Sequence, residues 1–278
     1  MAFTPCYATL RKENRKIEFD PIKHMTSDNG VYFDKKGVYN KAFGEPMMLK
    51  KEELDEFDTS DFEKSGGMLN LTFQSYPCCT QYKATKPNAV NPEGLWLGHM
   101  GKVVLWHKGD TINFAAHIDG YPSKNHALYA ASKLWEAAKL WNAANIGVQF
   151  KWVDKWEDAE FALAYGGSNG DTLAMAFFPN TDDLNTLFVY SRAFDNDAIN
   201  YQANIFAHEL GHVLGLRHEF AKQEGDAVIF GPENPNSVMS YKFPPVIQNT
   251  DVIFTRNVYD YAGSSIGGYP VVRVHPDN

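Results

Sequence analysis

The sequence is poor in cysteine, in clustered basic residues and in long apolar runs, and each shortage excludes a class of protein. Its three cysteines, Cys6 and the neighbouring pair Cys78 and Cys79, are an odd number, which does not form a disulfide framework. No apolar stretch approaches the roughly 18 residues that a membrane span needs. Lys and Arg are scattered and the formal net charge is −8, so we expect no nucleic-acid partner.

The composition that is present is typical of a globular protein. Of the 278 residues, 44% are hydrophobic and 22% are charged, so the chain can bury a real core as one large domain or two modest ones. The first ten residues are followed by the polar run 11–16, without the apolar segment of a signal peptide. The chain has no internal repeat or low-complexity tract, and we expect a monomer.

The first hundred residues differ in composition from the rest, which places a soft boundary near residue 100. Residues 51–64 are dense in Asp and Glu and are followed by a glycine pair, which is typical of a solvated and partly flexible stretch. Residues 84–101 are rich in Pro and Gly, which favours a linker or a long loop. We therefore predict an N-terminal extension over 1–100, as a prosegment, accessory region or N-terminal wrap, and the main domain over 101–278.

Beyond that boundary, hydrophobic periodicity predicts five strands and three helices. Apolar residues recur at helical spacing after Ser123, a good N-cap, which indicates a long helix to about Asn145. Strands are expected at 111–118, 147–153, 159–164, 173–178 and 186–191, and the other helices at 199–214 and 251–261. This order of elements predicts a mixed α/β or α+β domain.

One segment carries chemistry: residues 208–218 read H-E-L-G-H-V-L-G-L-R-H. Residues four apart share a face of a helix, so His208 and His212 direct their imidazoles toward one point. Zinc prefers nitrogen ligands in tetrahedral geometry, and such a pair supplies two of them. Glu209 follows the first ligand and can lie beside the metal, as the general base for its bound water.

Gly215 and His218 extend this pattern. Glycine readily takes the left-handed conformation that ends a helix, so the chain can turn sharply at Gly215 and return His218 as a third ligand. Three protein ligands leave one position open for water, which is typical of a catalytic rather than a structural zinc site.

The segment resembles the H-E-x-x-H-x-x-G-x-x-H motif of the metzincin metallopeptidases. The resemblance covers roughly residues 105–262 and implies a secreted, zinc-dependent endopeptidase. It also implies a twisted, mostly parallel five-stranded sheet with a backing helix, an active-site helix and a C-terminal helix. S-V-M-S-Y at 237–241 is similar to the methionine turn of the family, which implies that Met239 lies beneath the imidazoles. By the same resemblance, Tyr241 ligates zinc or hydrogen-bonds the oxyanion of the reaction.

Finer details resemble different branches of the metzincins. Glu219, directly after the third histidine, is similar to the astacin glutamate that supports nearby structure, whereas M-S-Y at 239–241 is more like the serralysins. The run 173–179 resembles the edge strand of matrixins, which implies that a substrate peptide pairs along it. The residues of this run expected to bind substrate are Leu173, Ala174, Met175 and Ala176. We interpret the chain as a divergent metzincin nearest to astacins and serralysins.

The N-terminal hundred residues could restrain such a protease until it is processed. A thiolate from Cys6, Cys78 or Cys79 could occupy the open zinc position, since sulfur is a good zinc ligand. The motif of the matrixin cysteine switch is absent around all three cysteines. Asp110 is a further candidate, reminiscent of astacin prosegments, although its place beside the first strand favours a structural role.

Two other functions stay open: a non-catalytic binding protein on a metzincin scaffold, and a zinc hydrolase of non-peptide substrates. The former is expected to lose Glu209 or a histidine, and none is lost. The loop 166–171 could bind calcium through backbone carbonyls and Asp171, although its full ligand set is not evident. The remaining histidines have no ligand spacing to one another and are expected to be structural or exposed: His24, His99, His107, His117, His126 and His275.

Overall fold

The computed structural model describes residues 33–34, 37–38, 47–65, 78, 80, 95–181, 184–219, 221, 227–231 and 233–276. The strands are β1 Phe33–Asp34, β2 Gly37–Val38, β3 Leu95–Leu97, β4 Val103–Trp106, β5 Thr111–Ala116, β6 Gln149–Trp152, β7 Phe161–Tyr165, β8 Ala174–Met175, β9 Asn185–Val189, β10 Val228–Phe230, β11 Ser265–Ile266 and β12 Tyr269–Val274. The α-helices are α2 Lys51–Asp55, α3 Ser60–Ser65, α4 Lys124–Ala144, α5 Gln202–Val213 and α7 Asn249–Asp260.

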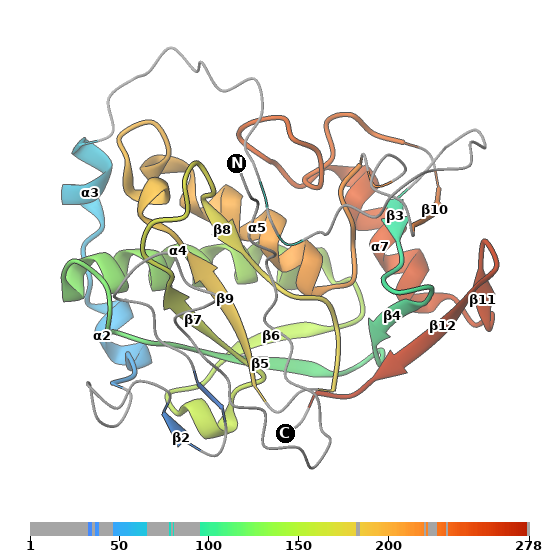
Figure 1. The fold of residues 1–278 in the computed structure, drawn as a ribbon, viewed down its shortest axis with the longest axis horizontal. Coiled ribbons are helices and arrows are strands. Elements are labelled where there is room, and N and C mark those ends of the chain that lie inside the picture. The colour runs from blue at the N-terminus through green and yellow to red at the C-terminus, as the bar shows by residue number, and fades with distance from the viewer. Residues whose placement is uncertain are drawn as a thin grey trace.

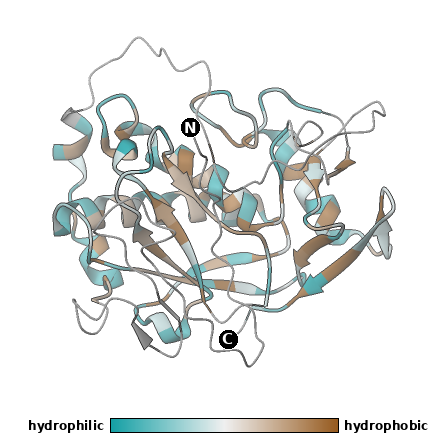
Figure 2. Cartoon of the chain, viewed as in Figure 1, coloured by the Kyte–Doolittle hydropathy of each residue, from teal (hydrophilic) through white to brown (hydrophobic). Residues whose placement is uncertain are grey.

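A five-stranded sheet forms the centre of the fold, in the order β6-β5-β7-β9-β8 (Figure 1). The first four strands in this order run parallel, and β8 pairs antiparallel with β9 at the edge. Strands β7 and β9 are buried along their whole length, as expected for central strands covered on both faces, and they are mostly brown in Figure 2. The predicted mixed fold with a mostly parallel five-stranded sheet is confirmed.

Helices α4 and α5 pack against each other and against the sheet (Figure 1). Ser123 caps α4, and Asn145 ends it in the left-handed conformation, so both predicted ends are confirmed. Two side chains of α4 bond α5 and the residues just before it. Trp141 Nε1 donates to the Ala207 carbonyl of α5 at 2.9 Å, and the Tyr129 hydroxyl donates to the Ile199 carbonyl, before α5, at 3.0 Å. These contacts hold α5, the helix of the histidine motif, in a fixed position over the sheet.

Three smaller sheets, which the sequence did not predict, accompany the central one in the described part of the chain, and one of them is the pair β1-β2. Strand β12 near the C-terminus pairs parallel with β4, and β10 pairs antiparallel with β3. Strand β3 lies within 84–101, so the prediction of a linker is wrong for the end of that range. The residues of β3 are buried because Leu97 bridges to Leu216 and the Trp96 carbonyl accepts from Arg217 N, both just after α5. Residues 84–94 lie outside the described residues.

The acidic stretch 51–64 is solvated, since most of its acidic residues are exposed, but it folds into α2 and α3, so the prediction of a partly flexible segment is corrected. Leu54 is buried, and the Phe62 ring stacks on Tyr129 of α4 with centroids 4.7 Å apart. Just before α2, Leu49 N donates to the Ala116 carbonyl and extends the pairing of β5. The few apolar residues of the stretch face the domain, while two of its acidic residues, Glu53 and Glu63, meet lysines of α4.

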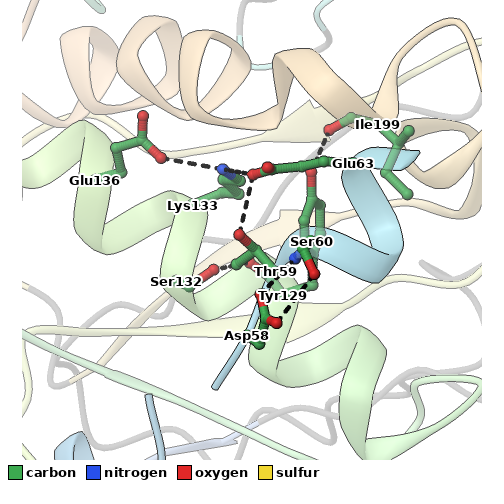
Figure 3. A network of polar contacts seen from close by, with 9 residues as sticks. All are labelled: Asp58, Thr59, Ser60, Glu63, Tyr129, Ser132, Lys133, Glu136 and Ile199. Carbon is green, nitrogen blue, oxygen red and sulfur yellow. Dashed lines mark hydrogen bonds and ion pairs between the residues drawn. The ribbon is translucent and has the colours of Figure 1, made fainter. Parts of the chain in front are cut away.

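Figure 3 shows the polar contacts that hold α3 on α4. Lys133 of α4 lies between two carboxylates, Glu63 at 2.9 Å and Glu136 at 3.2 Å, and Thr59 also donates to Glu63 at 3.0 Å. The Lys133 ammonium lowers the pKa of Glu63, mainly through their hydrogen bond. Lys124 makes a similar ion pair with Glu53 of α2. Residues 47–65 are therefore docked on the main domain.

Among the described helices, none combines the length and the apolar character that a membrane span requires.

Candidate metal centre

Helix α5 carries the first half of the histidine motif, as its spacing predicts. His208, Glu209 and His212 are fully buried, and the two imidazole rings have centroids 4.8 Å apart. Burial lowers the pKa of both histidines well below its usual value. Both rings are therefore neutral near neutral pH, which is the form that binds a metal.

The chain reverses direction after α5 at Gly215. This residue has φ +90°, and a Cβ built on it would lie 2.6 Å from the Val104 backbone carbonyl oxygen. Any side chain here meets both a strained backbone and a close neighbour, so the turn requires glycine. After this turn the ring of His218 comes back to the helix, with its Nε2 3.2 Å from Nε2 of His212.

Four potential ligand atoms meet at this point. One atom each from Cys78, His208, His212 and His218 lie within 4.8 Å of one another, and no other such group of three or more His, Cys, Asp or Glu occurs among the described residues. Tetrahedral zinc places two nitrogen ligands about 3.3 Å apart, and a nitrogen and a sulfur about 3.6 Å apart. The observed 3.2 Å between His212 and His218, and 3.5 Å between His212 Nε2 and Cys78 Sγ, fit these separations.

The second nitrogen of each ring is hydrogen-bonded away from this centre. Nδ1 of His208 lies 2.8 Å from the Val238 carbonyl, and Nδ1 of His212 lies 2.8 Å from the Leu216 carbonyl. A carbonyl only accepts, so both rings donate from Nδ1 and keep the lone pair of Nε2 for the metal. The Tyr241 hydroxyl lies 3.0 Å from Nδ1 of His218. In this position the phenol orients the His218 ring.

Glu209 lies beside the four ligand atoms. Its Oε1 accepts from the Cys78 thiol at 3.4 Å and its Oε2 accepts from the Thr80 hydroxyl at 2.9 Å. Burial raises the pKa of Glu209 to about 7, although these two hydrogen bonds oppose the increase. A carboxyl group with a pKa near 7 can both take up and release a proton at neutral pH.

Met239 packs against the helix that carries the histidines, and Glu219 is hydrogen-bonded to Met239. A Cβ built on Gly211 of α5 would lie 2.3 Å from Sδ of Met239, so the methionine packs directly against the backbone of the histidine helix. The backbone N–H of Glu219 donates to the Met239 carbonyl at 3.1 Å. Burial, followed by the nearby Asp251, raises the pKa of Glu219 to about 8. The sequence did not single out Gly211, although a larger residue there would displace the Met239 side chain from its present position.

The edge strand β8 ends next to Glu209. The four residues expected to bind substrate, Leu173, Ala174, Met175 and Ala176, are all buried. The backbone N–H of Ala176 donates to the Thr80 hydroxyl at 2.8 Å. Thr80 therefore bridges the edge strand and Glu209, a role that no pattern in the sequence indicated.

Of the other sequence-based candidates, Cys6, Cys79 and His24 lie outside the described residues. Asp110 lies away from the centre, with its carboxylate 3.1 Å from Nδ1 of His275. In the loop suggested to bind calcium, Gly167 and Gly170 have positive φ. The calcium site stays a prediction.

Known proteins support the same chemistry. Residues 163–268, less than half of the chain, match the family model described as metallo-peptidase family M12B, reprolysin-like. The matched segment contains the three histidines, Glu209 and Met239. No match to the chain was found among curated proteins. Fold, donor set and family match together support a zinc-dependent peptidase, while the nearer likeness to astacins, serralysins or matrixins is not confirmed.

Replacing Gly215 with Ala is expected to destabilise the fold more than replacing Gly109. Gly109 has a similar φ of +95° but nothing within 4 Å of an added Cβ, so Gly109→Ala reports backbone strain alone, about 1–3 kcal/mol. Gly215→Ala adds the contact with the Val104 carbonyl and should cost at least about 1 kcal/mol more. Urea unfolding of both variants measures the difference. Equal losses would show that the carbonyl moves away without cost.

Proposed function

We propose that this protein is a zinc-dependent endopeptidase of the metzincin type, held latent by its own N-terminal region. The observation that carries the proposal is the convergence of His208, His212 and His218 with Glu209 beside them. The donor set fits zinc in type and spacing, since neutral imidazoles at about tetrahedral separation are what this metal prefers. The proposed setting is outside the cell, as the metzincin resemblance implies.

Each residue of the centre has a role in this proposal. Zinc, when bound, polarises the substrate carbonyl and lowers the pKa of a bound water toward about 7. Glu209 takes the proton of the attacking water and returns it to the leaving amine, which its pKa of about 7 allows. Tyr241 holds the His218 ring through Nδ1, a contact that favours positioning over the oxyanion contact expected from the motif.

A peptide is the proposed substrate because β8 is an edge strand next to the general base. An extended peptide can pair through backbone hydrogen bonds with the side of β8 on which no described strand lies. The residues that would line this path are Leu173, Ala174, Met175 and Ala176. The Ala176 N–H is oriented toward the centre, since it donates to Thr80, which also contacts Glu209.

Latency is proposed because Cys78 and Thr80 occupy the places that water and substrate need. The Cys78 sulfur lies among the histidine nitrogens, at the distance of a fourth zinc ligand from His212. The Thr80 hydroxyl donates to Glu209, the proposed base, and accepts from the backbone N–H of Ala176 next to the edge strand. Docking of residues 47–65 on α4 anchors the same region to the domain. We propose that residues 1–94 include a prosegment.

A chelation experiment tests the proposed activity. The Cys78→Ser variant is incubated with casein, with or without 1,10-phenanthroline, and with the non-chelating 1,7 isomer as a control. We expect cleavage that is lost with the chelator alone and restored by added zinc, because removal of the metal removes carbonyl polarisation and water activation. Bound zinc without cleavage of any protein, even after limited proteolysis of the N-terminal region, would favour a non-peptide hydrolase or a binding protein on the same scaffold. Cleavage that resists chelation would refute the zinc mechanism.

A further inference from the structure

Helix α7 is connected to the methionine turn, residues 237–241, by one buried carboxylate. Asp251 lies in the first turn of α7 and is 1% exposed. Its Oδ1 accepts from the Ser237 hydroxyl at 2.6 Å, and its Oδ2 accepts from Val238 N at 2.8 Å. Oδ2 also accepts from Gln248 N at 2.8 Å, which caps the helix. One side chain thus satisfies three donors from two segments.

The turn held by Asp251 continues directly to a metal ligand. Val238 is bonded on both sides, because its N–H, in the 237–238 peptide, donates to Asp251, and its carbonyl, in the 238–239 peptide, accepts from Nδ1 of His208. In addition, the Ser237 hydroxyl accepts from Met239 N at 3.0 Å. A tilt of the 238–239 peptide would rotate the His208 ring and with it Nε2. The imidazole is therefore fixed by a carboxylate on a different helix, through the two peptide groups that flank Val238.

We infer that Asp251 is a positioning residue of the metal centre: through the Val238 N–H and the Ser237 hydroxyl it fixes the turn whose Val238 carbonyl sets the orientation of His208. This inference rests on the proposed zinc site. A carboxylate suits the place because it only accepts, and three donors converge on it. Outer partners of this kind orient histidine ligands and raise metal affinity.

The three donors make the carboxylate at this place hard to replace. Burial raises the pKa of Asp251, although its three hydrogen bonds oppose the increase. An apolar residue would leave the Ser237 hydroxyl and the N–H groups of Val238 and Gln248 without this acceptor, which would release the turn from α7. A test of the inference therefore needs a measurement at the metal centre besides stability.

The test measures zinc affinity rather than activity, by competition with a chromophoric chelator on the full chain. Asp251→Ala is expected to weaken zinc binding about 10–100-fold. Asp251→Asn should recover much of this loss, because its amide oxygen can take the Val238 and Gln248 donors while its NH₂ group donates to Ser237. Asp260→Ala is the matched control: this exposed aspartate on the same helix pairs with Lys108, far from the turn, and its loss should leave affinity unchanged.

The visible spectrum of the Co²⁺-substituted protein provides a second measurement, since it changes with ligand geometry. If folded Asp251→Ala binds zinc within twofold of wild type with the same cobalt spectrum, Asp251 is structural only and the inference is wrong. If Asp251→Ala does not fold, Ser237→Ala replaces it; weaker zinc binding supports the inference, and unchanged binding overturns it. A wild-type chain that binds no zinc would instead refute the proposed function.

Discussion

Glu209→Gln is expected to reduce kcat on a peptide substrate by about 10²–10⁴-fold, the usual contribution of a general base. The amide keeps the size of the side chain and can still accept from Thr80, but it cannot take a proton from water. Glu209 is not among the four proposed ligands, so zinc content should be unchanged. The assay uses the Cys78→Ser background, in which the thiol no longer competes for the centre.

A buried glutamate elsewhere on the sheet provides the control for this substitution. Glu160 is 1% exposed and its Oε1 accepts from Asn185 Nδ2 at 3.3 Å, outside the metal centre. Glu160→Gln should leave kcat within a factor of two, measured after zinc content and unfolding midpoints have been matched. If Glu209→Gln keeps more than a tenth of the activity with zinc bound, another group is the base.

The part of the site that lies within one helix and its following turn could be predicted from the sequence. Residues His208 and His212 share a face because the helix fixes their spacing, and Gly215 marks the turn because few other residues tolerate its φ of +90°. The long helix α4 was predictable for the same reason, with Ser123 and Asn145 at its ends. In each case a local rule acts over a few residues.

The contacts that complete the site could not be predicted, because they join distant segments. Cys78 and Thr80 meet Glu209 across 131 and 129 residues of chain, and no local feature distinguishes Cys78 from the other two cysteines. Asp251 looks like an ordinary acidic residue in the first turn of a helix until its neighbours are known. Pairing of β12 with β4 also depends on tertiary structure, since the residues of β12 do not alternate between buried and exposed positions.

Cys78→Ser combined with Thr80→Val is expected to make the full chain active without proteolytic processing. Serine is a poorer zinc ligand than cysteine, and valine keeps the shape of threonine while losing the bonds to Glu209 and Ala176. A hydrogen bond to a charged group contributes about 1.5–3 kcal/mol, so Thr80→Val alone should raise the active fraction about 10–100-fold where that fraction is small. Cleavage of a quenched fluorescent peptide, before and after limited proteolysis, measures each step.

Cys78→Ser and Thr80→Val are also measured singly, together with a control variant. The comparison shows whether activity rises because these two contacts are lost or because the domain is destabilised in general. Thr111→Val makes the same change of shape on β5, away from the centre, and should remain as latent as wild type. If wild type is already as active as the double variant, residues 78–80 do not inhibit. If the double variant stays inactive until proteolysis, another part of the N-terminal region closes the site. Thr80 contacts the proposed base, whereas Cys78 lies among the proposed metal ligands. The single variant with the larger gain in activity therefore identifies which of these two contacts contributes more to latency.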